Sequence, residues 1–188
     1  MPNNGSGLAV FRSFLDEYKQ LILVATAAGA VPLFAALTSL TPTWPSGLVG
    51  ITAVAQLLVL ALVFQLLRSA RRTVISRVMV RSTVILCFLL LVYFVLLSLF
   101  TYTEPASKER FTKGYECTSE ATIAFSKACP LLGFNEIRQA EFEEELLWTA
   151  PSVSFMKSVI LTVWLASFAA LSTALGSFVV FQMEQKHK

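Results

Sequence analysis

Four long apolar stretches constrain this chain more than any other feature of its sequence. They cover residues 20–40, 46–67, 82–102 and 152–183. A helix needs about 20 mostly apolar residues to cross a bilayer core about 30 Å thick, so each stretch is long enough. The chain is 55% hydrophobic and only 14% charged, with a mean hydropathy of +0.67, whereas a soluble domain is about a quarter charged. We therefore expect an all-α integral membrane protein with four transmembrane helices.

The distribution of charge predicts which side of the membrane each connection faces. Basic residues concentrate in cytoplasmic connections, and the linker 68–81 has five arginines and no acidic residue: Arg68, Arg71, Arg72, Arg77 and Arg81. The loop 103–151 has nine Glu against five Lys or Arg. We expect both termini in the cytoplasm and this loop outside, in a plasma or bacterial inner membrane. The arginines suit anionic lipid or an anionic or protein partner. Nucleic acid is not expected, because there is no basic soluble domain.

Residues 1–19 precede the first apolar stretch and form a separate segment from the membrane domain, 20–188. Their apolar side chains recur at helical spacing, at Leu8, Phe11, Phe14, Leu15 and Tyr18. This pattern predicts an amphipathic helix at the cytoplasmic membrane surface. A gating segment and a docking helix for a cytoplasmic partner are the alternatives.

The long exterior loop contains two cysteines in a compartment that favours disulfides, so Cys117 and Cys129 are expected to pair. A short helix is expected between them, capped by Thr118 or Ser119, and a second helix over 135–148. We expect Trp44, Tyr102 and Trp148 to belong to an aromatic belt at the outer interface.

Acidic residues crowd the approach to the fourth stretch, at Glu141, Glu143, Glu144 and Glu145. They form either a solvated acidic face or a ring of carboxylates at the mouth of a pore, where they would concentrate cations. Lys157, just inside the fourth stretch, is expected to extend outward or to pair with a loop glutamate, and the alternative is that it faces the pore at this mouth.

Two further groups of residues lie inside the predicted spans. Thr52 and Gln56 are one helical turn apart and serve either to hold helices together or to line a polar pore. Ala166, Ala170, Thr173 and Gly176 form a stripe of small residues that permits close helix packing. Cys87 is expected to be a buried, small apolar residue.

A cysteine pair in the second exterior loop resembles the four-helix membrane oxidases that pass electrons from thiols to quinone. Those enzymes also need a Cys-x-x-Cys pair in the first exterior loop, which here reads TPTWPS. Tetraspanins are similar in layout, but their Cys-Cys-Gly motif is absent. The single histidine, His187, cannot assemble a metal or haem site alone. We therefore expect no enzyme activity and no cofactor.

The function that these features predict first is a homo-oligomeric pore or a membrane-permeabilising effector. Small size, Gln56 and the acidic loop favour it. The alternative is a non-catalytic scaffold or accessory subunit that binds a membrane-protein partner through its disulfide-stapled loop. A thiol-redox enzyme is the minor alternative.

Overall fold

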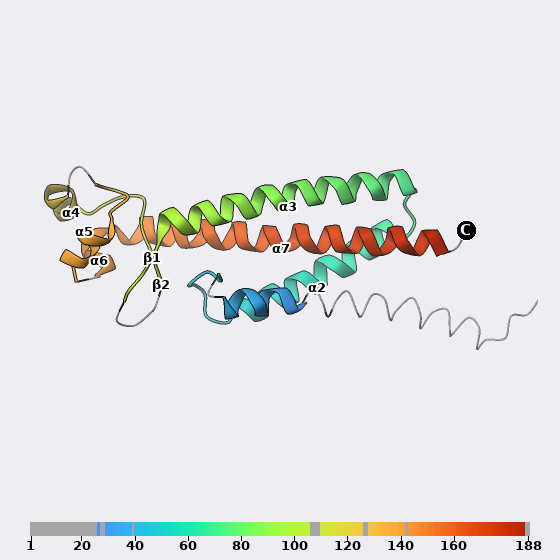
Figure 1. The fold of residues 1–188 in the computed structure, drawn as a ribbon, viewed down its shortest axis with the longest axis horizontal. Coiled ribbons are helices and arrows are strands. Elements are labelled where there is room, and N and C mark those ends of the chain that lie inside the picture. Colours follow the sequence, from blue (N-terminus) through green and yellow to red (C-terminus); the bar gives the residue numbers. More distant parts are fainter. Residues whose placement is uncertain are drawn as a thin grey trace, which may run out of the picture. The chain divides into compact units, whose positions relative to one another are not determined.

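The protein is mostly helical. The structure is a computed structural model that describes residues 26, 29–38, 40–105, 110–125, 128–141 and 143–186 (Figure 1). Within these residues, three helices are long and apolar enough to cross a membrane: α2 (Leu48–Leu67), α3 (Arg72–Phe100) and α7 (Ala150–Lys186). The amphipathic segment 1–19 and most of the first predicted span lie outside the described residues. Of that span, residues 29–37 are helical.

Helix α3 begins ten residues before the predicted third span. Arg72, Arg77 and Arg81 therefore lie in a helix, and only residues 68–71 form the turn between α2 and α3. The backbone N–H of Ala70 donates to the carbonyl of Leu67 over 3.0 Å in this turn. The absence of Gly and Pro between Arg72 and Phe100 is consistent with the early start, because neither residue interrupts the helix there.

Two compact units make up the chain. The first contains Val49–Leu86, Ser167–Lys188 and the described residues before Pro42. Its packing joins α2 to the C-terminal half of α7, where Leu67, Ile75 and Val180 form a buried cluster. A Cβ on Gly176 would lie 3.0 Å from Val63 Cγ1 and 3.2 Å from Leu60 Cδ1. Successive residues of α2 thus meet successive residues of α7, so the two helices run parallel in this unit.

The second unit contains Pro42–Leu48 and Cys87–Ala166. We call its residues 101–149 the loop domain. It contains strands β1 (Thr101–Thr103) and β2 (Arg110–Thr112), which pair antiparallel with Tyr102 opposite Phe111. Three short helices follow: α4 (Ser119–Ala124), α5 (Phe134–Gln139) and α6 (Glu144–Leu147).

The loop domain corrects two expectations. The protein is not all-α, because the backbone leaves helical geometry at Thr101 and forms the hairpin. The single helix expected over 135–148 is two helices, with Glu141 between them in left-handed geometry at φ 54°. That conformation is incompatible with a continuous right-handed helix.

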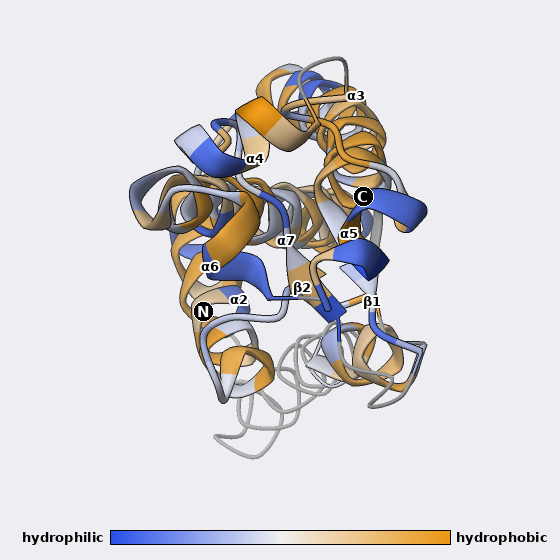
Figure 2. Ribbon diagram, turned by 90° about the vertical axis from the view of Figure 1, so that its left-hand side faces the viewer, coloured by the Kyte–Doolittle hydropathy of each residue, from blue (hydrophilic) through white to orange (hydrophobic). Residues whose placement is uncertain are grey.

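A hydrophobic core holds the loop domain together. Trp148, Leu132, Ile137 and Leu147 are each at most 1% exposed, and Tyr102, Ala121 and Val153 complete the cluster. Two members of the expected aromatic belt, Tyr102 and Trp148, are therefore core residues, and only Trp44 is exposed, at 50%. Figure 2 shows the difference in residue hydropathy along the ribbon, with hydrophobic colour predominating on α3 and hydrophilic colour on parts of α4 and α5.

Candidate functional site

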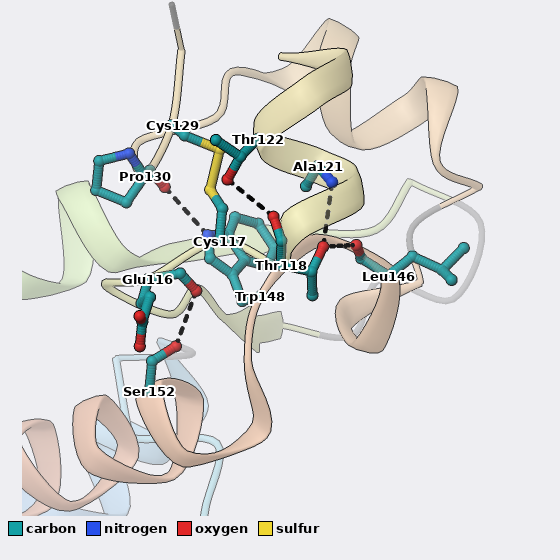
Figure 3. The surroundings of a disulfide bond; sticks show 10 residues. All are labelled: Glu116, Cys117, Thr118, Ala121, Thr122, Cys129, Pro130, Leu146, Trp148 and Ser152. Carbon is teal, nitrogen blue, oxygen red and sulfur yellow. Dashed lines mark hydrogen bonds between the residues drawn. A yellow bond between two sulfur atoms is a disulfide. The ribbon is translucent and has the colours of Figure 1, made fainter. Parts of the chain in front are cut away.

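The disulfide predicted from the sequence is present and joins Cys117 to Cys129, with their Cα atoms 6.2 Å apart (Figure 3). The bond closes the segment that contains α4. Thr118 caps this helix as expected, because its hydroxyl accepts a hydrogen bond from the backbone N–H of Ala121 over 3.1 Å. The same hydroxyl donates to the carbonyl of Leu146 over 2.7 Å. One threonine thus fixes the start of α4 and ties it to α6.

Trp148 connects three segments of the loop domain. Its backbone pairs with Cys117 in an isolated antiparallel bridge, in which Thr118 N–H donates to Leu147 O and Thr149 N–H donates to Glu116 O, each over 3.1 Å. Its indole Nε1 donates to the carbonyl of Pro130 over 3.1 Å (Figure 3). The disulfide and the contacts of Trp148 therefore connect the same part of the loop domain.

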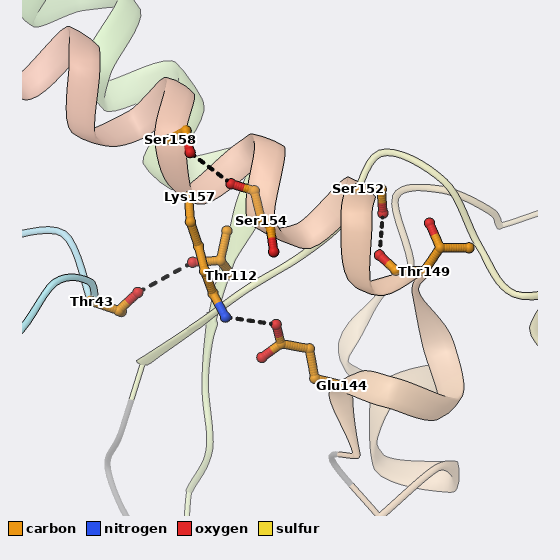
Figure 4. Close-up of polar contacts among 8 residues, drawn as sticks. All are labelled: Thr43, Thr112, Glu144, Thr149, Ser152, Ser154, Lys157 and Ser158. Carbon is orange, nitrogen blue, oxygen red and sulfur yellow. Dashed lines mark hydrogen bonds and ion pairs between the residues drawn. The ribbon is translucent and has the colours of Figure 1, made fainter.

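The four clustered glutamates do not share one environment. Glu144 is partly buried and accepts an ion-paired hydrogen bond from Lys157 Nζ at 2.9 Å (Figure 4). Glu141, Glu143 and Glu145 are exposed. The structure therefore brings Lys157 together with one predicted mouth residue and leaves the other three on the surface of the loop domain.

Four large apolar side chains of the loop domain are exposed. Ile123 on α4 is 85% exposed, and Leu131, Phe134 and Leu146 are about half exposed. Exposed apolar side chains are typical of protein-binding surfaces where they gather into one patch with a polar surround. We call Ile123, Leu131, Phe134 and Leu146 the apolar face.

Thr52 and Gln56 are buried inside the first unit, at 0% and 1% exposure. Neither amide atom of Gln56 has a hydrogen-bond partner in the described part of the chain, and the same holds for the hydroxyl of the fully buried Ser172. One helical turn separates Gln56 from Leu60 and Ser172 from Gly176, and Leu60 lies against Gly176. Because α2 and α7 are parallel here, the unbonded amide and hydroxyl lie at one level of the helix pair.

The small-residue stripe is only partly a packing face. Gly176 and Ala170 are buried, whereas Ala166 and Thr173 are half-buried. The unbonded hydroxyl of Ser172 lies between these positions in α7. The Ser172-x-x-x-Gly176 spacing predicts a helix-packing position, but it gives no sign that the hydroxyl lacks a hydrogen bond.

The five arginines are all exposed. The guanidinium of Arg72 lies 4.6 Å from the centre of the Phe181 ring, a cation–π contact within the first unit. Cys87 is exposed as well, contrary to expectation, because the described chain leaves that surface of α3 uncovered.

Two titrating groups of the loop domain have shifted pKa values. Burial, together with the neighbouring Glu144 and Glu104 carboxylates, raises the pKa of Tyr102 to about 12. Burial lowers the pKa of Lys113, and the nearby Glu136 partly opposes that change. Lys113 Nζ donates to the carbonyl of Leu132 over 2.7 Å, so it anchors the segment before α5.

Sequence reasoning missed Arg110 and Gly114. The signal for the hairpin was local: Thr-Tyr-Thr and Arg-Phe-Thr are β-favouring triplets on either side of Pro105. No local sequence pattern indicates that residue 114 must be glycine. Glycine is required there because Ser152 and Trp148 approach its backbone closely.

Comparison with family models, with curated proteins and with solved structures finds no match to this chain. Within the described ranges, no group of three His, Cys, Asp or Glu side chains is placed to hold a metal ion.

Proposed function

We propose that this protein is a non-catalytic membrane protein whose loop domain binds another protein outside the cell or in the periplasm. The observation that carries the proposal is the apolar face on a domain that is otherwise locked. The disulfide, the Trp148 bridge and the Thr118 cap hold the loop domain rigid, yet Ile123 remains 85% exposed. Rigid presentation reduces the entropy lost on binding.

The chemistry of the surface defines the partner. The exposed carboxylates of Glu141, Glu143 and Glu145 adjoin α6, whose Leu146 belongs to the apolar face. A domain that exposes both apolar side chains and carboxylates is complementary to a protein surface with apolar and basic residues. We propose a membrane-protein partner of that kind.

The proposal includes four transmembrane helices, with both termini and the arginines cytoplasmic, in a plasma or inner membrane. The charge asymmetry between residues 68–81 and 103–151 supports this orientation. Protease added to sealed cells should cleave a site inserted in the loop domain and leave a C-terminal tag intact. The reverse pattern would contradict the orientation.

Site-specific photocrosslinking in native membranes tests the binding role. A benzophenone amino acid at position 123 should give one discrete adduct, and the same group at the exposed Gln139 should give much less. Leu146→Glu should remove the adduct, and Glu141→Gln with Glu143→Gln should weaken it. Equal adducts at 123 and 139, or an adduct insensitive to Leu146→Glu, would contradict the proposal.

A homo-oligomeric pore is the second candidate, and one observation favours it. The amide of Gln56 and the hydroxyl of Ser172 are buried in a predicted membrane segment without hydrogen bonds. A buried unsatisfied amide costs about 1–3 kcal/mol, and water entering along α2 and α7 would remove that cost. Gln56 is 1% exposed in the single chain, so this pore requires α2 and α7 to separate.

A further inference from the structure

A pocket in the second unit is lined by two basic residues and by no acidic residue. Its polar walls are Arg110, Lys157, Thr43, Thr101 and Thr112, and no Asp or Glu lines it. Leu97, Ile160 and Trp44 are among its apolar walls. The pocket is small and partly open, because its empty volume of about 230 Å³ includes open solvent.

Arg110 supplies a positive charge that the described chain does not balance. Lys157 is paired with Glu144 at 2.9 Å, so one of the two cations is neutralised (Figure 4). The Nη1 atom of Arg110 is buried and has no hydrogen-bond partner among the described residues. A buried guanidinium N–H without an acceptor is costly, and an anion that enters the pocket would supply the acceptor.

Hydroxyl groups add to the donors beside Arg110. Thr43 Oγ1 and Thr112 Oγ1 lie 3.2 Å apart and share a hydrogen bond, so the acceptor of that pair retains its own hydrogen for a ligand (Figure 4). Thr101 is not available in this way, because its hydroxyl donates to Leu97 O over 2.6 Å. The donor set is therefore a guanidinium N–H, an ammonium and one hydroxyl.

We propose that this pocket binds a phosphate-type oxyanion, through Arg110 with help from Lys157 and from the hydroxyl of Thr43 or Thr112 that accepts in their shared hydrogen bond. A guanidinium matches the geometry of phosphate oxygens, and the Lys157 ammonium can donate a further hydrogen bond while it stays paired with Glu144. The anion comes either from a phospholipid headgroup or from a soluble phosphate. The apolar walls Leu97 and Ile160 would contact the apolar part of a lipid, whereas free phosphate has no apolar part for them to contact. The site is independent of the apolar face and of partner binding.

Titration of the full chain in a phosphate-free maltoside detergent tests the site. The probes are inorganic phosphate and a short-chain phosphatidylglycerol, followed by calorimetry. We expect saturable binding that Arg110→Gln weakens at least about tenfold, which is the effect of losing one charge-assisted hydrogen bond. Arg138→Gln removes the same charge from an exposed position of α5 and should leave binding unchanged.

The two probes distinguish the sources. Binding of the lipid alone assigns the site to a headgroup, and binding of both with similar affinity assigns it to phosphate itself. Failure of wild type to bind either probe saturably, or equal binding by Arg110→Gln and Arg138→Gln, would overturn the proposal.

A second measurement needs no variant and covers the case in which Arg110→Gln does not fold. Phenylglyoxal modifies accessible arginines, and the modified positions are read by mass spectrometry. The bound probe should slow modification of Arg110 several-fold and leave Arg138 unaffected. Equal protection of both arginines, or of neither, would overturn the site.

Discussion

Trp148 and Pro130 are joined by a hydrogen bond from the indole Nε1 to the prolyl carbonyl, 3.1 Å long, directly beside the Cys117–Cys129 disulfide (Figure 3). Pro130 follows Cys129 in the chain, and Trp148 pairs by its backbone with Cys117. The disulfide, the indole hydrogen bond and the backbone bridge therefore connect three segments pairwise, at residues 117, 129–130 and 148. These connections make the loop domain a rigid support for the apolar face.

Removal of the disulfide should loosen the loop domain. Replacement of Cys117 and Cys129 by Ser should lower the free energy of unfolding by about 3 kcal/mol, because the closed segment spans about a dozen residues. Urea unfolding followed by near-ultraviolet circular dichroism measures the change. Cys87→Ser, at an exposed free cysteine, is the control and should have little effect. Equal stability of the double variant and this control would contradict the role of the bond.

Trp148→Phe should cost about 1–3 kcal/mol, because the carbonyl of Pro130 loses its donor inside a buried core. The substitution retains an aromatic ring in the cluster. Trp44→Phe changes the same residue type at a half-exposed position and should stay within about 0.5 kcal/mol. Urea unfolding, followed by near-ultraviolet circular dichroism, compares the stabilities of the two variants. A Trp148→Phe protein as stable as Trp44→Phe would exclude the hydrogen bond as a stabilising contact.

Gly114→Ala should destabilise the loop domain by about 1–3 kcal/mol, as overpacking does. The added Cβ would collide with Ser152 Oγ and lie 2.8 Å from Trp148 Cβ. Gly50→Ala is the matched control, because a Cβ there meets nothing within 4 Å and the residue is in helix α2. That control should gain about 0.5–1 kcal/mol. Thermal melts of both variants measure the contrast, and a shift of the same sign in both would contradict the packing described.

Alkaline pH should destabilise the loop domain through Tyr102. Its folded pKa of about 12 lies above the ordinary value of 10.0, so the folded state holds its proton more tightly than the unfolded state. The resulting stabilisation is complete below pH 10 and is lost as the pH rises towards 12. Tyr102→Phe should therefore flatten the fall in unfolding temperature between pH 10 and 12. The lowered pKa of Lys113 has the opposite effect. Its contribution to the free energy of unfolding increases as the pH rises to the ordinary lysine value of 10.5.

Helices α2 and α7 were predictable because hydropathy and length alone specify them. The bounds of α2 and α7 fall within three residues of the stretches read from the sequence. The start of α3 was less certain, because arginine and valine continue a helix as readily as they form a surface linker. The disulfide and the Thr118 cap were predictable from local chemistry.

The remaining features depend on tertiary contacts that no local pattern reveals. Trp148 reads as an interface aromatic, but its partners Cys117 and Pro130 are 31 and 18 residues away in the sequence. Arg110 reads as an ordinary surface charge until the pocket beside Thr43 and Lys157 is seen. Gln56 was recognised as special, but only the packing of α2 against α7 shows that its amide lies within the chain.

Ion and dye flux through liposomes that contain the purified protein tests the central claim most directly. The claim is that the protein binds a partner and does not conduct, so wild type should give no flux above empty liposomes. Gln56→Leu should leave flux unchanged and hold or raise stability, because it removes a buried amide without hydrogen bonds. Gln65→Leu changes an exposed residue of the same helix and is the matched control. Reproducible flux in wild type that Gln56→Leu alters and Gln65→Leu does not would contradict the account and establish the pore.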